Sequence, residues 1–314
     1  MKPLTAHGKA ILFGEHSVVY GHPALAMAIE DALCATRVTA RPGGVKVHVP
    51  AWGLVCDDGA DSKIAEALRL LESLLPGSGG MDLEVASSIP MGAGLGSSAA
   101  LSVLLVKALA HVRGMDLDLT CVRNTAHALE RVFHGNPSGL DDATATYGGL
   151  CLFHKGGADR LPFAEQLDTQ IHRLHLDPPP LVVADSLVKR STAEKVAWVR
   201  RLREEDPALV ERAFLAMTEA LFSGVEAIRT RDRQALGRAM NTCHKALSDL
   251  GLSCPELDRM VEVACSAGAY GAKVTGAGGG GCIIAFAPGR EEAVKQALET
   301  AGFPAFTIQK EGWI

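Results

Sequence analysis

The sequence predicts a protein of about two domains that mix helices and strands. Its 314 residues are about twice the roughly 150 residues of a typical domain. With 47% hydrophobic and 21% charged residues, the chain has enough apolar material for folded cores, and disorder is excluded as its main state. Segments with strand-like alternation lie between longer segments with helical periodicity.

The first half contains strands and helices that can be predicted from the spacing of apolar residues. Residues 10–13 form a short apolar run that predicts a strand, and residues 37–49 alternate as in a β ribbon. The apolar spacing of residues 62–75 is typical of an amphipathic helix. Residues 97–112 and 119–133 are also predicted to be helical.

The second half begins after three consecutive prolines, residues 178–180, which predict a domain boundary. The predicted domains are therefore residues 1–178 and 179–314. Beyond the boundary, apolar patterning predicts strands at 181–184, 272–275 and 282–287, and helices at 192–203, 207–230, 234–250 and 255–267.

Charge and cysteine usage limit the partners and the compartment. A net charge of −5 provides no basic field for nucleic acid or for an anionic membrane surface. The 8 cysteines form no Cys-x-x-Cys pair, which favours free thiols in a reducing cytoplasm over a disulfide framework. The N-terminus lacks the apolar run of a signal peptide. Proline, glycine and serine interrupt the uncharged segment 85–106, so no membrane helix is expected there.

The chain has 33 glycines. Those that are informative about function fall in three islands, at residues 8–21, 92–96 and 276–281. The second island alternates glycines and leads directly into a predicted helix. Its backbone N–H groups, with the first turn of that helix, predict an anion site, most naturally for phosphate. Ser97 and Ser98 suit the N-cap or the first turn, where a hydroxyl can also bind Mg²⁺. A glycine turn capped by serine is the alternative, but it explains three spaced glycines poorly.

Neither glycine-rich segment matches a common nucleotide motif in its proper context. The second island lacks the lysine of a Walker A loop. The third has a formal G-x-G-x-x-G match, but a strand follows it instead of a helix, which argues against a dinucleotide site. Two strands joined by so many glycines indicate close backbone approach to a ligand or to another domain.

Charged residues lie close to these islands. Lys9 is placed on a predicted strand, and Glu15 and His16 follow Gly14 at its end. Glu130 ends a predicted helix, and a polar turn at residues 134–142 carries two adjacent aspartates. Taken alone, such an aspartate pair is usually a solvated cap and a lone glutamate on a helix is usually a surface residue.

Four segments in a fixed order change this interpretation. They are residues 8–21, 90–100, 130–141 and 273–282. Together they resemble the motifs of the GHMP kinases, with residues 90–100 similar to the phosphate-binding motif. Residues 130–141 resemble the mevalonate kinase branch and separate it from galactokinases and homoserine kinases. The motifs occupy both ends and the middle of the chain, so the resemblance covers nearly all of it.

The resemblance implies a fold and an activity. The fold class would be α+β, with a ribosomal protein S5 domain 2-like N-terminal domain and a ferredoxin-like C-terminal domain. The activity would be transfer of phosphate from ATP to the primary hydroxyl of mevalonate, with Mg²⁺ as cofactor. We expect a cytoplasmic homodimer that binds mevalonate and ATP and that has neither nucleic acid nor membrane as a partner.

The resemblance also implies roles for individual residues. Asp141 would face the substrate hydroxyl, and Lys9 would lie beside it and stabilise the charge that moves with the phosphoryl group. Ser98 and Glu130 would bind Mg²⁺. The nucleotide would contact Pro90, Gly92, Ala93, Gly94, Leu95, Gly96, Ser97, Ser98, Ala99, Gly278 and Gly279, and the substrate would contact Glu15, His16, Lys155, Thr192 and Thr275.

One departure and two alternatives accompany this assignment. The family commonly has asparagine where this chain has Asp142, whose carboxylate would either repel that of Asp141 or point into solvent. A related enzyme acting on phosphomevalonate would need more basic residues in its pocket, whereas residues 134–136 favour the unphosphorylated acid. A non-catalytic sensor on the same fold would have lost acid, base or metal positions, and this chain keeps all of them.

Overall fold

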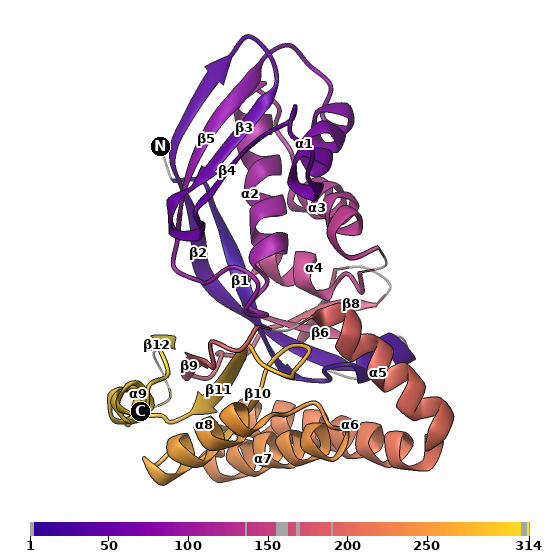
Figure 1. Cartoon of the computed structure of the whole chain (residues 1–314), viewed down its shortest axis with the longest axis vertical. Helices are drawn as coiled ribbons and strands as arrows, with labels where there is room; N and C mark the ends of the chain where they lie inside the picture. The colour runs from indigo at the N-terminus through magenta and orange to yellow at the C-terminus, as the bar shows by residue number, and fades with distance from the viewer. Residues whose placement is uncertain are drawn as a thin grey trace. The chain divides into compact units, whose positions relative to one another are not determined.

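A computed structural model describes residues 3–135, 137–154, 163–167, 170–189, 191–308 and 313. The chain forms two compact units. Unit 1 comprises residues 1–9 and 28–148, and unit 2 comprises residues 10–27 and 149–314. Each unit combines helices with strands, which confirms the α+β class (Figure 1). The domain boundary at 178/179 stays a prediction, because domains and compact units need not coincide.

Two long strands, β1 (Thr5–Phe13) and β2 (Ala24–Arg41), contribute residues to both units. The other regular elements of unit 1 are β3 (Val45–Val49), η2 (Pro50–Trp52), β4 (Leu54–Asp57), α1 (Lys63–Leu74), β5 (Gly80–Ser87), α2 (Ser97–Val112), α3 (Leu119–His134) and α4 (Leu140–Tyr147). The helices predicted at 62–75, 97–112 and 119–133 are therefore confirmed to within one residue at each end.

The sheet of unit 1 corrects the predicted ribbon at residues 37–49. That segment is two strands, the end of β2 and the whole of β3, separated by a turn in which Gly44 has a φ of 72°. β5 lies between them, antiparallel to β2 and parallel to β3. Alternation identified both strands correctly, but it carries no information about which strand is the hydrogen-bonded neighbour.

Helix α2 is the centre of unit 1. Most of its residues are buried around its whole circumference, as is typical of a helix that lies inside a core. It packs against α3, α4 and β5 (Figure 1). The uncharged segment 85–106 is thus the end of β5, the glycine loop and the first part of α2.

Unit 2 contains the remaining elements. They are η1 (Ser17–Tyr20), β6 (Leu150–Phe153), β7 (Ala164–Gln166), β8 (Ile171–Leu174), β9 (Leu181–Asp185), α5 (Thr192–Glu205), α6 (Pro207–Thr230), α7 (Arg233–Asp249), α8 (Pro255–Ser266), β10 (Gly271–Val274), β11 (Cys282–Phe286), α9 (Glu291–Thr300) and β12 (Ala305–Ile308). Every helix and strand predicted beyond residue 180 is present, with ends displaced by at most two residues.

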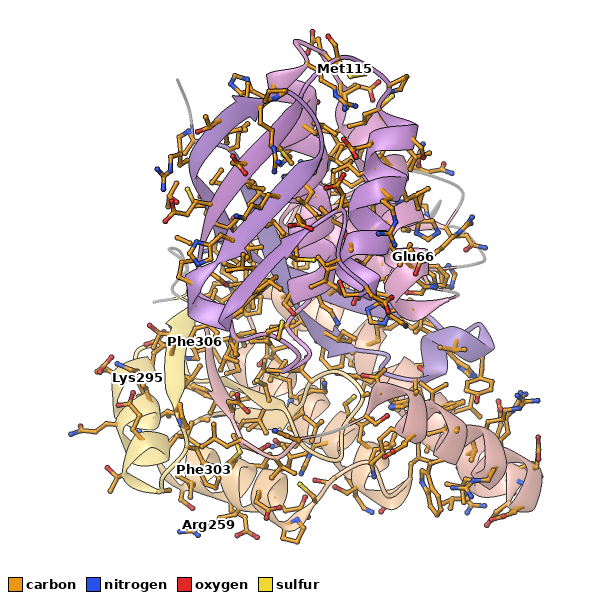
Figure 2. The ribbon with its side chains drawn as sticks, turned by 45° about the horizontal axis from the view of Figure 1, so that its top comes forward. Glu66, Met115, Arg259, Lys295, Phe303 and Phe306 are labelled. Carbon is orange, nitrogen blue, oxygen red and sulfur yellow. The ribbon has the colours of Figure 1, made fainter. Side chains whose placement is uncertain are left out.

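Unit 2 has an antiparallel sheet in the order β10-β11-β9-β12. Helices α7 and α8 pack against β10. The contact with α7 depends on Gly237, because a Cβ atom there would lie only 2.3 Å from the carbonyl oxygen of Tyr270. The Arg259 guanidinium of α8 lies 5.9 Å from the ring centre of Phe303. Figure 2 labels both residues.

Two further observations concern the thiols and the membrane. None of the 8 cysteines, all of which lie among the described residues, forms a disulfide, and Cys56, Cys151, Cys243 and Cys282 are buried. Among the helices that the structure describes, none is long and apolar enough to cross a bilayer.

Candidate active site

The second glycine island is a tight loop between β5 and α2. Gly92, Gly94 and Gly96 have φ angles of 77°, 89° and 72°, a region that side chains other than glycine rarely adopt. Gly96 is the N-cap of α2, and the Ser97 hydroxyl accepts a hydrogen bond of 3.2 Å from the backbone N–H of Gly92. Ser97 and Ser98 lie in the first turn, as predicted. The loop and the start of the helix have the form of an anion site.

Lys9 and Asp141 meet beside this loop. The backbone N–H of Lys9 donates to the carbonyl of Leu95 over 2.8 Å, which joins β1 to the glycine loop. The Lys9 ammonium lies 3.2 Å from the Asp141 carboxylate, and their side chains are 5% and 36% exposed. Lys9 is therefore a buried cation behind an acid that solvent reaches.

Asp141 stands at the start of a helix that the sequence had not revealed. The predicted polar turn ends at Gly139, whose φ is 85°, and α4 begins at Leu140. A carboxylate in the first turn is stabilised by the positive end of the helix dipole. Helix α4 thus gives Asp141 a fixed direction that a flexible turn would not.

Glu130 is buried, so the alternative that it is a surface residue is wrong. Only 1% of it is exposed, and its two carboxylate oxygens accept hydrogen bonds from Ser98 at 3.0 Å and Ser102 at 2.9 Å. Burial raises the pKa of Glu130 to about 8, and the negative charges of Asp141 and Asp142 add to the effect. His134 lies 3.6 Å away, and burial lowers its pKa, so it brings little positive charge.

Asp142 does not point into solvent, which corrects one of the two expectations for this residue. It is 0% exposed, and its carboxylate lies 2.9 Å from Arg123 and 3.2 Å from His127. Arg123 offsets its charge, and what remains contributes to the raised pKa of Glu130. Asp142 therefore anchors α4 to α3.

The sequence contained a signal for these partners that the motif analysis missed. Four polar residues recur along α3 at intervals of four, three and four residues, namely Arg123, His127, Glu130 and His134. That spacing places side chains on one face of a helix. It would have predicted a polar face directed at a common site.

Unit 2 brings together three of the predicted substrate residues. Glu15, His16 and Thr275 are 1%, 8% and 0% exposed. The Thr275 hydroxyl accepts from the backbone N–H of Ile11 at 2.9 Å and donates to its carbonyl at 3.1 Å. Because the donor hydrogen of this hydroxyl is used by β1, the hydroxyl could only accept from a substrate, and its role as a substrate ligand stays a prediction.

The other predicted residues of unit 2 that the structure describes are Thr192, Gly278 and Gly279. Thr192 is exposed at the start of α5. Lys155 lies outside the described residues. Gly278 and Gly279 join β10 to β11, and the backbone N–H of Gly279 donates to the carbonyl of Leu252 over 2.8 Å. A Cβ atom on Gly278 would lie 2.0 Å from that carbonyl oxygen, so glycine is required there for packing.

Gly96→Ala should disable the loop without unfolding unit 1. The new Cβ would lie 2.7 Å from Lys9 Cγ, and the φ of 72° disfavours any side chain. We expect kcat/KM of the expected phosphoryl transfer to fall on the order of 10²-fold, because Lys9 would be displaced from Asp141. Steady-state kinetics and thermal unfolding would be measured together.

Gly114→Ala is the matched control for this variant. Gly114 lies just past the other end of α2 with a φ of 64°, and nothing lies within 4 Å of the added Cβ. In both variants, alanine in a left-handed backbone conformation costs about 1–2 kcal/mol of stability. Only the alanine of Gly96→Ala also contacts Lys9. Equal losses of activity would show that strain, and not the displacement of Lys9, explains the effect.

Few of the described side chains are available to bind a metal ion, and the candidates are oxygen ligands. Among the residues that the structure describes, no three His, Cys, Asp or Glu side chains form a metal-binding group. Ser98 and Glu130 offer two oxygen ligands that touch each other. This set suits Mg²⁺, which binds one or two protein oxygens and takes its other ligands from water and phosphate.

Comparison with known proteins places this geometry in context. Residues 62–149 match the model of the GHMP kinases N terminal domain, and residues 225–305 match GHMP kinases C terminal. The chain is 37% identical to "Mevalonate kinase" of Pyrococcus horikoshii, over 98% of this chain and 96% of that protein. It is 36% identical to "Mevalonate kinase" of Thermococcus gammatolerans, with the same coverage. The crystal structure of L. major mevalonate kinase in complex with R-mevalonate has a TM-score of 0.81 and 26% identity, covering 99% of this chain and 97% of that one.

Proposed function

Because the chain belongs to the GHMP kinases and, within them, to the mevalonate kinase family, we propose that it phosphorylates mevalonate. ATP is the phosphoryl donor, and the products are 5-phosphomevalonate and ADP, a step toward isoprenoid precursors. The expected two-domain GHMP kinase fold is confirmed by the family models and by the structural likeness. The observation that carries the proposal is the ion pair between buried Lys9 and accessible Asp141 beside the glycine loop.

The glycine loop and the start of α2 would hold the triphosphate. Positive φ angles at three glycines allow successive backbone N–H groups to face one anion. The N-terminus of α2 adds its unpaired N–H groups and its dipole. Together they would supply positive potential locally to a chain whose net charge is −5.

Ser98 and Glu130 would hold the Mg²⁺ ion. A carboxyl group whose pKa burial raises to about 8 is one that a cation would stabilise in its charged form. When bound, Mg²⁺ would neutralise charge on the phosphate oxygens as the phosphoryl group moves. Ser102 fixes the orientation of Glu130 through a 2.9 Å hydrogen bond, as the outer partners of metal ligands do.

Asp141 and Lys9 would act on the acceptor. With 36% of its side chain exposed, Asp141 can be reached by an alcohol from solvent, and it would accept or orient the hydroxyl proton. Lys9, 3.2 Å behind it, would stabilise negative charge that develops during transfer. The chemistry is thus positioning and charge neutralisation, and no covalent step on the protein is required.

The remaining assignments are parts of the proposal. His16, Lys155, Thr192 and Thr275 would line the substrate pocket together with the loop that carries Glu15, and Gly278 and Gly279 would contact the nucleotide. A homodimer and a cytoplasmic location are proposed as well, the latter supported by 8 cysteines that form no disulfide. Analytical ultracentrifugation at several protein concentrations would test the dimer.

A coupled ADP-release assay tests the proposed function. The panel contains mevalonate, phosphomevalonate, galactose and homoserine, each with Mg²⁺ and ATP. We expect turnover with mevalonate and kcat/KM within the usual range of about 10⁴–10⁸ M⁻¹s⁻¹. Preference for phosphomevalonate would favour the related enzyme, and ATP binding without turnover of any alcohol would favour a sensor.

A further inference from the structure

We propose that Lys273 is a positioning residue whose buried ion pair with Glu15 fixes the loop Gly14–His16. Glu15 then serves as the counter-ion of Lys273 and does not bind the substrate. This inference rests on the proposed function for its link to mevalonate, and it changes the role predicted for Glu15. All of the contacts that carry it lie within unit 2.

The Lys273 ammonium has no capacity left for a ligand. It donates to the Glu15 carboxylate, to the carbonyl of Val274 at 2.6 Å and to the carbonyl of Ile11 at 3.4 Å. An ammonium has three donors, and three acceptors surround this one. The side chains of both Lys273 and Glu15 are 0% exposed, so no substrate or phosphate reaches the pair.

Glu15 is held on both of its oxygens. Oε1 accepts from Lys273, and Oε2 accepts from the thiol of Cys243 at 3.7 Å. Burial raises the pKa of Cys243 to about 12, so the thiol keeps the proton that it donates. A free carboxylate here would repel an acidic substrate such as mevalonate, whereas the paired one presents no net charge.

The loop that this pair holds has an unusual backbone. Gly14 has a φ of 94°, and His16 has a φ of 59°, which is uncommon for a residue with a side chain. Such a conformation persists only where its surroundings enforce it. Glu15 is fixed by Lys273 on β10, and the His16 ring makes a 2.9 Å hydrogen bond with the carbonyl of Ala277, four residues after that lysine.

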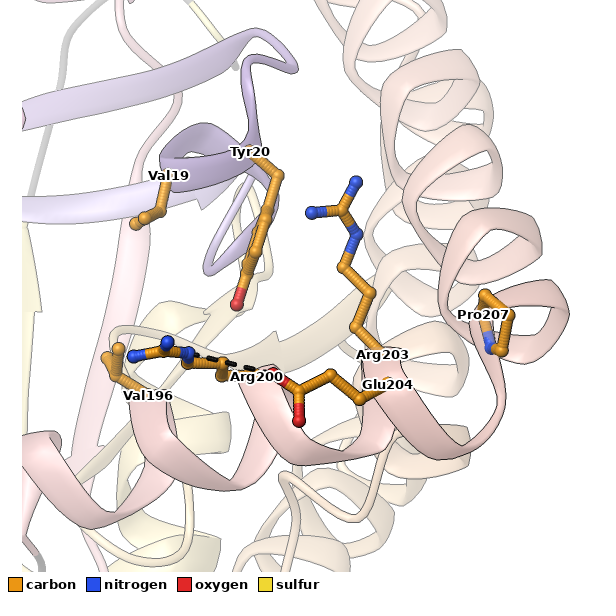
Figure 3. Close-up of a pocket in the computed structure, with 7 residues that line it drawn as sticks. All are labelled: Val19, Tyr20, Val196, Arg200, Arg203, Glu204 and Pro207. Carbon is orange, nitrogen blue, oxygen red and sulfur yellow. Dashed lines mark ion pairs between the residues drawn. The ribbon is translucent and has the colours of Figure 1, made fainter.

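The segment that follows the loop, η1, is anchored separately on helices α5 and α6. Tyr20 at the end of η1 packs on Phe214 with ring centres 5.4 Å apart, and the Arg203 guanidinium lies 4.8 Å from the centre of the Tyr20 ring. Tyr20 and Arg203 also line a pocket of about 570 Å³. Figure 3 shows both side chains among the residues that line it. Loop Gly14–His16 is therefore fixed between two anchors, and Lys273 provides the charged one.

A double-variant cycle tests the proposal. Lys273→Met and Glu15→Met each leave one buried charge unpaired, whereas the double variant removes both charges at similar volume. Each single variant should lower Tm and raise the KM for mevalonate on the order of tenfold or more, with the KM for ATP nearly unchanged. The double variant should regain most of both losses.

Lys245→Met is the control, because Lys245 pairs with Asp249 on the exposed face of α7 and its side chain is 76% exposed. It should change neither Tm nor either KM. A double variant whose KM for mevalonate is no better than that of Glu15→Met would mean that Glu15 binds the substrate, and would overturn the proposal. Single variants that lower kcat and leave both KM values unchanged would indicate only a loss of active protein, and would overturn the positioning role of Lys273.

The unfolding measurements separate this proposal from the proposed function. These measurements need no substrate. If the effects of the two single variants on the free energy of unfolding simply add, the ion pair is overturned, whatever substrate the enzyme phosphorylates. If the wild-type protein fails to turn over mevalonate, the proposed function fails. The non-additive recovery of Tm in the double variant would still establish the pair, and only its link to mevalonate would be lost.

Discussion

Asp141→Asn is expected to lower kcat by roughly 10²–10⁴-fold, the range for loss of an acid–base group, while the KM for ATP stays nearly constant. Asparagine keeps the size of the side chain and can still accept a hydrogen bond from Lys9, which lies 3.2 Å from the carboxylate. It cannot take a proton from the acceptor hydroxyl. Because Asp141 does not belong to the glycine loop, nucleotide binding should survive.

Steady-state kinetics with mevalonate and calorimetric titration with Mg²⁺-ATP would separate these effects. Asp116→Asn is a suitable control, since Asp116 is an exposed acid in the α2–α3 connection of the same unit. Asp142 is unsuitable, because its buried carboxylate holds Arg123 and its loss would destabilise α4. Near-normal turnover by Asp141→Asn would remove Asp141 from the catalytic assignment.

Local patterning was enough to locate most helices of the fold. Helix α6 begins at Pro207 and α2 at the serines after Gly96, and both were predicted at their observed ends. Proline in the first turn and glycine at the N-cap are signals carried by the sequence itself. Helix α4 escaped prediction because its eight residues have a weak apolar pattern and follow a turn rich in glycine and proline.

Long-range partners could not be predicted in the same way. The partner of Glu15 is Lys273, 258 residues away, and periodicity in a strand says nothing about such a contact. Motif resemblance brought Lys9, Ser98, Glu130 and Asp141 to attention, and the structure gathers them in unit 1. It could not predict that Asp142 would be buried, because that depends on the direction of α4 and on Arg123 across from it.

Glu130→Gln should make the ligand-free protein more stable and the enzyme worse. In the folded protein the pKa of Glu130 is raised to about 8, whereas in the unfolded chain it is near its ordinary value of about 4.3. Between these values the folded state holds a proton that the unfolded state has released. Stability therefore falls as pH rises from about 4.3 to about 8, by several kcal/mol at about 1.4 kcal/mol per pH unit.

Glutamine removes this dependence because its amide does not titrate. The Tm of Glu130→Gln minus that of the wild type, measured without nucleotide or metal, should grow steadily between about pH 5 and pH 8. Glu66→Gln is the control, an exposed glutamate in the first turn of α1 that Figure 2 labels. A difference in Tm that does not change with pH would mean that burial does not raise the pKa of Glu130.

The same substitution should weaken the response to Mg²⁺, because the amide lacks the charge that a divalent cation requires. We expect the Mg²⁺ concentration for half-maximal activity to rise at least about 10–100-fold, the effect seen when even the outer partners of metal ligands are lost. An unchanged Mg²⁺ requirement would leave Glu130 without a role as a ligand. A variant that gains stability and loses Mg²⁺ response would show that the protein keeps a destabilising carboxylate in its core because a bound cation uses it.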